Sequence, residues 1–347
     1  MQVFDPFDSE SVARRLLVFL RAQAGEQAEI GALARFTVGF SWVTYGFQAK
    51  WIEAGQRLER NLILRVGPPN GIFAPYRAGP EFRTLSALQG SAVRVPRAYW
   101  CCDDVEVLGA PFFICERVEG EAPIPWSRDG KPVFDAASRT SLADQFIGAA
   151  AALHNFSWRG TGIEALEGAK TPEHAAVSEI DVWTGRMQSW SARRYPILEY
   201  ALAWFRARAP RAARISVVHG DYRIGNFLVA DGKITAILDW ELVHLGDPLE
   251  DLGWICMQAW RGRSPYMCHL LTREELSDKY AVLTGMDVDT AALRYWEAFG
   301  TFKLAVMHLA AAYSFETRGF NDMRMAGMAA QIPRMLLQVE AALEQAA

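Results

Sequence analysis

The spacing of apolar and polar positions changes along the chain, and each change predicts a different kind of element. Residues 9–23 repeat apolar side chains at helical intervals, which predicts an amphipathic helix. Residues 34–66 are rich in aromatic and β-branched side chains and predict strands joined by turns. Residues 79–89 have a helical pattern, whereas residues 95–100 and 111–118 predict further strands. The first third of the chain is therefore expected to form an antiparallel sheet with one or two helices.

The pattern becomes mainly helical after Gly120. Residues 135–154 are rich in alanine with apolar positions at helical spacing, and residues 176–208 predict one or two more helices. Residues 214–239 form an island of β pattern before the C-terminal helices, and the proline-containing stretch 121–132 is expected to be a surface loop. A sheet-rich first part followed by a mostly helical second part predicts an α+β protein with two lobes.

Composition narrows the class of protein without identifying it. Hydrophobic residues make up 51% and charged residues 22% of the 347 positions, the balance of a soluble globular protein. A net charge of −4 argues against a nucleic-acid partner, which usually requires a basic excess. The most apolar late stretch, residues 304–313, is too short to span a membrane, and the N-terminal segment does not resemble a secretory signal. Five cysteines without a CxxC pair favour a reducing compartment. We therefore expect a cytoplasmic protein with no membrane partner, of an oligomeric state that the sequence does not reveal.

Candidate metal ligands lie in the β island, which reads HGDYRIGN, FLVA, DG and KITAILDW. Asp231-Gly232 is a strong signal for a two-residue hairpin turn. The resulting strand pairing would put Asn226 opposite Ile237, with Asp239 two residues beyond. Diagonal neighbours in a strand pair lie about 7–8 Å apart, so one ion could contact both the amide and the carboxylate. Hard oxygen ligands of this kind suit Mg²⁺, which is the predicted metal.

Asp221 lies at the other end of the same loop. A carboxylate at this position could accept the proton of an attacking hydroxyl while the ion neutralises phosphate charge. Phosphoryl transfer asks a protein for little more than positioning and charge stabilisation. The segment therefore predicts a Mg²⁺- and nucleotide-dependent kinase.

Two other functions compete with this interpretation. A two-metal hydrolase could use a cluster made of His219, Asp221, Asp239, His244 and Asp247. That hypothesis leaves Asn226 unexplained. A nucleotide-binding regulator without turnover is the second alternative, and the complete set of base and metal ligands argues against it.

The string HGDYRIGN…ILDWE…GDPLEDLGW strongly resembles the aminoglycoside phosphotransferase family, relatives of choline kinases and, more distantly, of protein kinases. The resemblance implies a protein-kinase-like fold with a small antiparallel-sheet lobe, residues 1–118, that binds the nucleotide. Residues 119–347 would form the larger, mostly helical lobe for catalysis and substrate binding. By position, the resemblance makes Asp221 the catalytic aspartate, Asn226 and Asp239 the metal ligands, and His219 and Asp251 residues that brace the catalytic loop.

The same resemblance assigns nucleotide-binding positions in the first lobe. Arg65 would hold the phosphates of ATP or GTP and pair with Glu81, at a position where the family often has lysine. Arginine keeps the charge and adds a planar fork, so function is expected to survive. Ser41 lies in a turn that resembles the nucleotide-covering loop. The backbone of Glu116 and Val118 corresponds to the hinge that reads the nucleobase.

The acceptor is expected to lie against the segment that follows Asp251. Residues 252–273 contain no Asp or Glu, and their candidate substrate-binding side chains are Trp254, Trp260, Arg261 and Arg263. Such a segment suits an anionic or apolar alcohol better than a polycation. The alternative is that the tryptophans belong to the core and the arginines are solvated. GDPLEDLGW also resembles kinase-like domains fused to some acyl-CoA dehydrogenases, which implies a hydroxyacyl thioester or a related hydroxy acid as acceptor.

Overall fold

The computed structural model describes residues 4–37, 39, 41–124, 133–191, 193–317, 319 and 322–347. Its first part contains the helices α1 (Ser9–Ala24), α2 (Gly79–Leu88) and α3 (Val105–Leu108) and the strands β1 (Glu29–Ile30), β2 (Ala34–Phe36), β3 (Val43–Glu53), β4 (Gln56–Val66), β5 (Ala98–Cys102) and β6 (Phe112–Glu116). The predicted surface loop 121–132 lies mostly outside the described residues.

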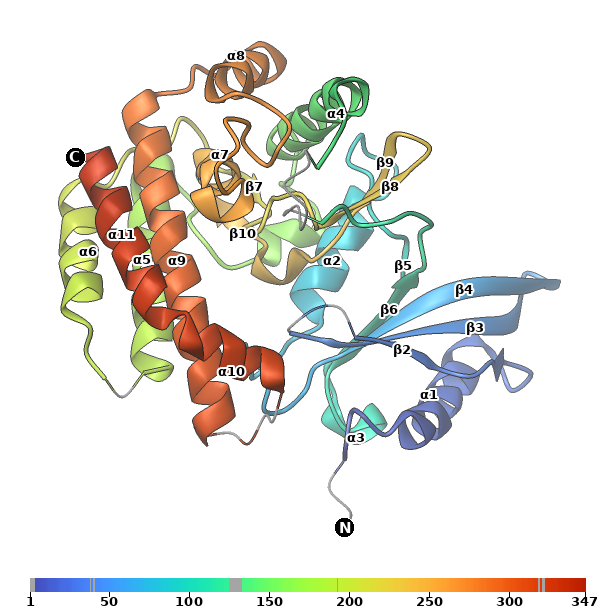
Figure 1. Ribbon diagram of the computed structural model, residues 1–347. Helices are drawn as coiled ribbons and strands as arrows, with labels where there is room; N and C mark the ends of the chain where they lie inside the picture. The colour runs from blue at the N-terminus through green and yellow to red at the C-terminus, as the bar shows by residue number, and fades with distance from the viewer. Residues whose placement is uncertain are drawn as a thin grey trace.

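The second part is mainly helical (Figure 1). Its α-helices are α4 (Ala136–His154), α5 (Ala175–Ser189), α6 (Pro196–Ala207), α7 (Leu249–Cys256), α8 (Arg273–Thr284), α9 (Thr290–Thr317), α10 (Met323–Ala330) and α11 (Ile332–Ala346). Its strands are β7 (Ser216–Val218), β8 (Phe227–Ala230), β9 (Lys233–Ile237) and β10 (His244–Gly246). Short 3₁₀ turns are η1 (Gly162–Ala165), η2 (Pro172–His174), η3 (Trp240–Leu242) and η4 (Gln258–Trp260).

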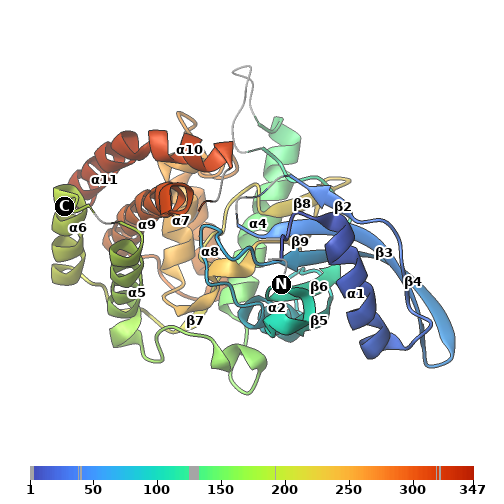
Figure 2. The same ribbon diagram turned by 90° about the horizontal axis from the view of Figure 1, so that it is seen from below.

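The first part is built on one six-stranded antiparallel sheet. The order of its strands is β1-β3-β4-β6-β5, and β2 pairs with the free part of β3. Tyr45 and Phe47 alternate inward along β3 and pack in one cluster with the buried face of α1. Figure 2 shows α1 beside the sheet, seen from below. Asp8 caps α1 by accepting hydrogen bonds from two backbone N–H groups of its first turn. The predicted helix and the predicted sheet are both confirmed.

The helices α5, α6, α9 and α11 lie together on the side of the molecule away from the sheet (Figures 1 and 2). Their apolar faces share one core, in which Phe205 and Phe299 are fully buried. The helix α7 packs closely against α9, so the segment that follows the β island rests on this helical body. No helix of the described chain is long and apolar enough to cross a membrane.

The strands β8 and β9 form the predicted hairpin, but the predicted register is wrong by one residue. A shift in the middle of the hairpin places Phe227, rather than Asn226, opposite Ile237. Asn226 lies instead beside Leu238, whose N–H donates to the Asn226 carbonyl at 2.8 Å. Such a bulge sets two residues of one strand against one residue of its partner. Asp239 therefore follows directly after the residue that bonds Asn226.

Candidate active site

Arg65 joins the sheet lobe to the end of the β8–β9 hairpin. It lies near the end of β4, and its Nη1 donates to Glu81 of α2 at 3.1 Å. Its Nη2 donates to Asp239 at 2.7 Å. Burial raises the pKa of Glu81 to about 7, although the Arg65 guanidinium opposes that rise. The expected pair of Arg65 with Glu81 is thus present, and the same side chain also reaches a predicted metal ligand.

Asp239 and Glu241 present two carboxylates at the start of η3. Asp239 has φ 67° and ψ 57°, a left-handed conformation that few non-glycine residues adopt and that Asp tolerates better than most. Burial would raise the pKa of Asp239, but Arg65, together with Arg223, holds the pKa below its usual range. Burial and the charge of Asp239 raise the pKa of Glu241 well above its usual value. The Glu241 Oε2 is buried and has no hydrogen-bond partner among the described residues.

Asp221 lies in the loop between β7 and β8, where three donors hold its carboxylate. The Asn226 amide donates to Oδ2 at 2.6 Å. The Trp254 indole N–H and the Arg223 Nε donate to Oδ1 at 2.7 and 2.9 Å. The guanidinium of Arg223 in turn lies 4.5 Å from the ring centre of Trp260. The carboxylate is thereby fixed in one orientation beside the end of the hairpin.

The backbone of the loop is held from beneath by Asp251. Its carboxylate accepts the N–H groups of His219 at 2.8 Å and Gly220 at 2.9 Å. Burial would raise the pKa of Asp251, but hydrogen bonding with His154 helps to hold that pKa below its usual range. The His219 Nε2 lies 2.9 Å from the carbonyl oxygen of Leu238, which ties the loop to the hairpin. Asp251 therefore holds the backbone of the loop that carries Asp221, and His219 ties this loop to the hairpin.

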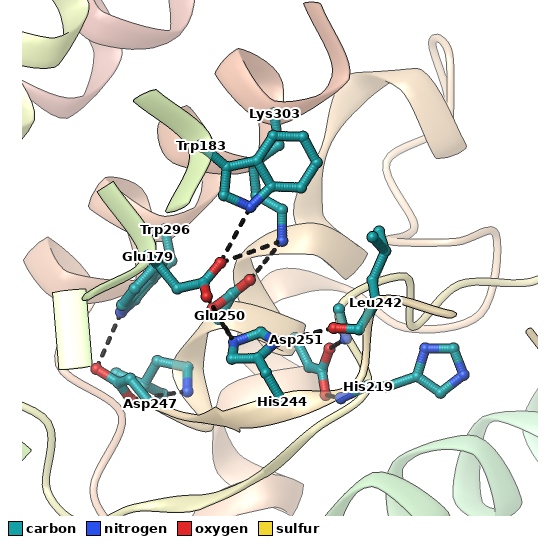
Figure 3. A network of polar contacts seen from close by, with 12 residues as sticks. Glu179, Trp183, His219, Leu242, His244, Asp247, Glu250, Asp251, Trp296 and Lys303 are labelled. Carbon is teal, nitrogen blue, oxygen red and sulfur yellow. Dashed lines mark hydrogen bonds and ion pairs between the residues drawn. The ribbon is translucent and has the colours of Figure 1, made fainter. Parts of the chain in front are cut away.

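A buried ion cluster lies behind this loop (Figure 3). Lys303 of α9 donates to Glu250 at 2.5 Å and lies 4.0 Å from Glu179 of α5. His244 lies 3.0 Å from Glu250 and 3.4 Å from Glu179. The other ring nitrogen of His244 lies 2.9 Å from the carbonyl oxygen of Leu242, which can only accept. Both nitrogens of His244 therefore act as donors, and the ring is a cation that balances the two carboxylates together with Lys303.

We expect the stability of the protein to fall as pH rises through the titration of His244. Burial lowers the pKa of this ring, but Glu179 and Glu250 raise it to about 9. The ordinary value is near 6.5, so the stabilisation is complete below about pH 6.5 and is lost as pH rises through about 9. The loss amounts to about 3 kcal/mol at most. Urea unfolding of the wild type between pH 7 and 9.5 should show this slope.

The control is a His244→Gln variant, whose free energy of unfolding should change far less over the same window. The raised carboxyl groups of Glu81 and Asp247, with pKa values of about 7 and about 6, complete most of their titration at lower pH. Equal slopes in wild type and variant would contradict the assignment.

Among the described residues, those of the alternative two-metal hydrolase do not come together in one cluster. His244 belongs to the buried ion cluster, and Asp247 accepts the indole N–H of Trp296 at 2.9 Å. Figure 3 shows both residues separated from the ring of His219, which points the other way. Among the described residues, the group of three His, Cys, Asp or Glu side chains whose ligand atoms lie close together is Glu179, His244 and Glu250, and Lys303 already supplies a cation there.

The remaining nucleotide-binding candidates are Ser41, Glu116 and Val118. Ser41 is buried, and its hydroxyl bonds the Tyr76 hydroxyl at 3.0 Å. Glu116 ends β6, and its N–H donates to the Arg97 carbonyl at 2.8 Å. Val118 lies two residues beyond the end of that strand. Their predicted nucleotide contacts stay predictions.

The predicted acceptor residues fall into different environments. Trp254 is 2% exposed and holds Asp221, and the ring of Trp260 packs against it with centres 5.6 Å apart. Arg261 lines a cavity together with residues of α8, α9 and α11. Arg263 is exposed and does not line that cavity.

Reasoning from the sequence missed three residues that shape the site. Arg223 stands inside the quoted motif, and Glu241 follows Asp239 by two positions, so a search for charged neighbours of the motif would have found both. His154, by contrast, ends an alanine-rich helix and gives no sequence signal of its contact with Asp251.

The small antiparallel-sheet lobe and the mostly helical lobe meet beside the HGD loop, and the Arg65–Asp239 contact is one of the bonds between them. This arrangement is that of a kinase-like phosphotransferase. A sequence model of the phosphotransferase enzyme family matches residues 44–308. The chain belongs to this family, which confirms the predicted resemblance and the predicted enzyme class.

Curated relatives show the second predicted likeness. The chain is 27% identical over 205 residues to acyl-CoA dehydrogenase family member 10 of Mus musculus, a match that covers 57% of this chain and 18% of the relative. It is 24% identical over 314 residues to acyl-CoA dehydrogenase family member 11 of Pongo abelii, covering 86% of this chain and 38% of the relative. The chain therefore spans well under half the length of these relatives.

Solved structures confirm the predicted α+β, protein-kinase-like fold. A candidate aminoglycoside phosphotransferase from Ralstonia eutropha JMP134 superposes with a TM-score of 0.71 at 21% identity, covering 96% of this chain and 98% of the other. A mutant of aminoglycoside phosphotransferase APH(4)-Ia in complex with ADP and hygromycin B gives a TM-score of 0.57 at 16% identity, covering 95% of this chain and 98% of the other.

Proposed function

We propose that this protein is a Mg²⁺-dependent kinase that transfers the γ-phosphate of a nucleotide, ATP by preference, to a hydroxyl group of a small molecule. The observation that carries the proposal is the junction at Asp239, where a cation of the sheet lobe meets the hairpin that also holds Asn226 and, through it, Asp221. In this proposal residues 1–118 bind the nucleotide, and residues 119–347 provide catalysis and the acceptor site.

The side-chain oxygen atoms at this junction are suitable ligands for Mg²⁺. The Asn226 amide nitrogen is occupied by Asp221, so its oxygen is the atom left for a metal. Asp239 and Glu241 add carboxylates, and the Glu241 Oε2 is buried without a partner among the described residues. Mg²⁺ usually takes one or two carboxylates and completes its shell with water and substrate phosphates. When bound, the ion would neutralise phosphate charge that develops during transfer.

Different residues of the chain have different roles in the proposed phosphoryl transfer. The acceptor oxygen attacks the γ-phosphorus, the bond to the oxygen that bridges the β and γ phosphates breaks, and the nucleoside diphosphate leaves. Asp221 accepts the proton that the hydroxyl loses, because Trp254, Arg223 and Asn226 fix its carboxylate in place. Arg65 binds phosphate, and Glu81 keeps it oriented.

Similar structures support a nucleotide co-substrate. The APH(4)-Ia mutant was solved with ADP and hygromycin B, and a related mutant with AMP-PNP and hygromycin B. By this analogy the nucleotide would contact Ser41 and the backbone of Glu116 and Val118, and its phosphates would lie beside Arg65.

Replacing Arg65 by methionine should raise the Kd for Mg·AMP-PNP about 10–100-fold, because charged hydrogen bonds contribute about 1.5–3 kcal/mol. Isothermal titration calorimetry measures the change. The Arg65→Lys variant keeps the charge and should retain more of the affinity, although lysine cannot reproduce the fork that reaches both Glu81 and Asp239. Wild-type affinity in Arg65→Met would remove Arg65 from the nucleotide site.

The proposed acceptor is an anionic or apolar alcohol, and a hydroxyacyl thioester is the leading candidate. Two observations support it: residues 252–273 contain no acidic side chain, and the curated relatives carry the name acyl-CoA dehydrogenase. A panel of aminoglycosides, choline, sugars and hydroxyacyl-CoAs, assayed for ATP-dependent phosphorylation, tests the proposal. Efficient turnover of an aminoglycoside would overturn the acceptor assignment.

The same panel separates the kinase from a nucleotide-binding regulator. Wild-type protein that binds Mg·ATP but phosphorylates no acceptor would favour the regulator. Turnover of any acceptor that requires Mg²⁺ would favour the kinase.

A further inference from the structure

A cavity of about 650 Å³ lies between the η4 segment, the start of α8 and the helices α9 and α11. The two long helices run side by side in Figure 1, with α8 at their upper end. The charged side chains that line it are Arg261, Arg273, Arg294, Arg334 and Glu297. Its size is that of a site for a small organic molecule.

The lining carries a strong excess of positive charge. The single carboxylate, Glu297, is paired with Arg273 at 2.6 Å. The Arg273 Nη1 is nevertheless buried and without a hydrogen-bond partner within the described part of the chain. Arg261 and Arg294 each donate to backbone carbonyls, and neither forms an ion pair with a described carboxylate. Several guanidinium groups thus face one cavity with only one of them neutralised.

One short segment connects the cavity with the proposed catalytic centre. Trp254 holds Asp221, and Trp260 packs between Trp254 and Arg223. The residues on either side of Trp260, Ala259 and Arg261, line the cavity. Residues 259–261 therefore contribute both to the cavity and to the contacts around the residues that hold Asp221.

We propose that this cavity binds the phosphate groups of an organic phosphate ester, and that the acceptor carries those groups. Guanidinium forks bind phosphate oxygens in pairs, and a net excess of three positive charges matches a diphosphate better than a single carboxylate. The binding site stands on the cavity alone, whereas its assignment to the acceptor rests on the proposed kinase function. The acceptor thioester would then be held by its phosphate-bearing end, with its hydroxyl directed to the catalytic loop.

The first experiment measures binding of inorganic pyrophosphate by calorimetry, in EDTA and at low salt. Arg334→Gln and Arg261→Gln should each weaken binding about 3–10-fold, and the double variant should weaken it further. Arg14→Gln, an exposed arginine of α1, makes the same change of net charge far from the cavity and should leave the Kd unchanged. Arg65→Met removes the phosphate contact of the proposed nucleotide site, so pyrophosphate binding that persists in this variant and is weakened by the cavity variants belongs to the cavity.

Two results would overturn the proposal that the cavity is a phosphate-binding site. One is the absence of wild-type binding at millimolar pyrophosphate. The other is a Kd that responds to Arg65→Met and to neither cavity variant. Melting temperatures of all variants establish that each is folded, and Arg334 is exposed enough that its replacement should not disturb the core. These measurements need no turnover, so they stand whether or not the kinase function does.

A second experiment distinguishes a phosphate carried by the acceptor from free phosphate that acts as an effector. The probes are one hydroxyacyl group presented as its coenzyme A thioester and as its phosphate-free N-acetylcysteamine thioester. Arg334→Gln should raise the KM of the first about 3–10-fold with kcat unchanged, and leave the KM of the second unchanged. Two observations together would overturn the acceptor assignment. The coenzyme A thioester would have equal KM values in wild type and Arg334→Gln, and pyrophosphate would alter turnover of the phosphate-free thioester, which is the behaviour of an effector site.

Discussion

Replacing Asp221 by alanine should leave Mg·ATP binding in place and lower kcat at least about 10²-fold, the lower end for general acid–base groups. The proposed metal and phosphate contacts lie on Asn226, Asp239 and Arg65, so the nucleotide should still bind. The proton of the acceptor hydroxyl would then have no positioned base. Steady-state kinetics with the acceptor found in the panel, combined with calorimetry of Mg·AMP-PNP, separates the two effects.

The contacts of Asp221 suggest a gentler second variant and a matched control. Alanine would leave three hydrogen-bond donors without an acceptor. Asp221→Asn instead keeps the shape of the side chain and one oxygen that can accept from Trp254 and Arg223. It should lose kcat to a similar extent with a smaller loss of stability. Asp231→Asn at the hairpin tip, φ 49°, makes the same chemical change where asparagine tolerates the backbone and should keep wild-type kcat. Unchanged turnover in Asp221→Asn would refute the base assignment.

Local sequence signals predicted the β8–β9 hairpin but not its register. Asp231-Gly232 determines the turn, because positive φ at both positions is what a tight hairpin needs. The bulge farther along has no comparable marker, since apolar residues continue on both sides of it. The displacement by one residue matters, because it bonds Leu238 to Asn226, so that Asp239 follows one residue beyond this bond.

Contacts between distant residues were visible only where family resemblance supplied them. The pair of Arg65 with Glu81 was expected from that resemblance. The contact of Arg65 with Asp239 spans 174 positions and has no signature in either segment. The ion pairs of Lys303 are even harder to predict from the sequence. Lys303 precedes an apolar helical stretch, and no nearby residue indicates that it pairs with Glu250 and Glu179.

The buried ion cluster helps to fix the start of α7, which holds the backbone of the Asp221 loop. Glu250 lies in the buried ion cluster, and the next residue, Asp251, holds the backbone of the loop. Burial would raise the pKa of Glu250, but Lys303 and His244 lower it to about 2. The first turn of α7 is therefore held at Glu250 by ion pairs and at Asp251 by hydrogen bonds with the loop that it supports.

Replacing Lys303 by methionine should destabilise the protein by about 3–5 kcal/mol, because removing one partner of a buried ion pair leaves the other charge uncompensated. Methionine keeps much of the volume, so the loss reports charge rather than a cavity. Lys279→Met, which removes the exposed contact with Asp144 at 2.8 Å, is the matched control and should cost no more than about 1 kcal/mol. Urea unfolding at pH 7 compares the two variants.

A second substitution tests whether charge balance is the cause. In Lys303→Met the cluster retains two carboxylates against one imidazolium, so it carries an uncompensated negative charge. Adding Glu250→Gln restores neutrality, since His244 then faces Glu179 alone, and the double variant should be more stable than Lys303→Met. A double variant whose loss equals the sum of the two single losses would instead show that Lys303 acts through packing against Trp183 and Trp254, whose ring centres lie 5.0 and 5.4 Å from its Nζ.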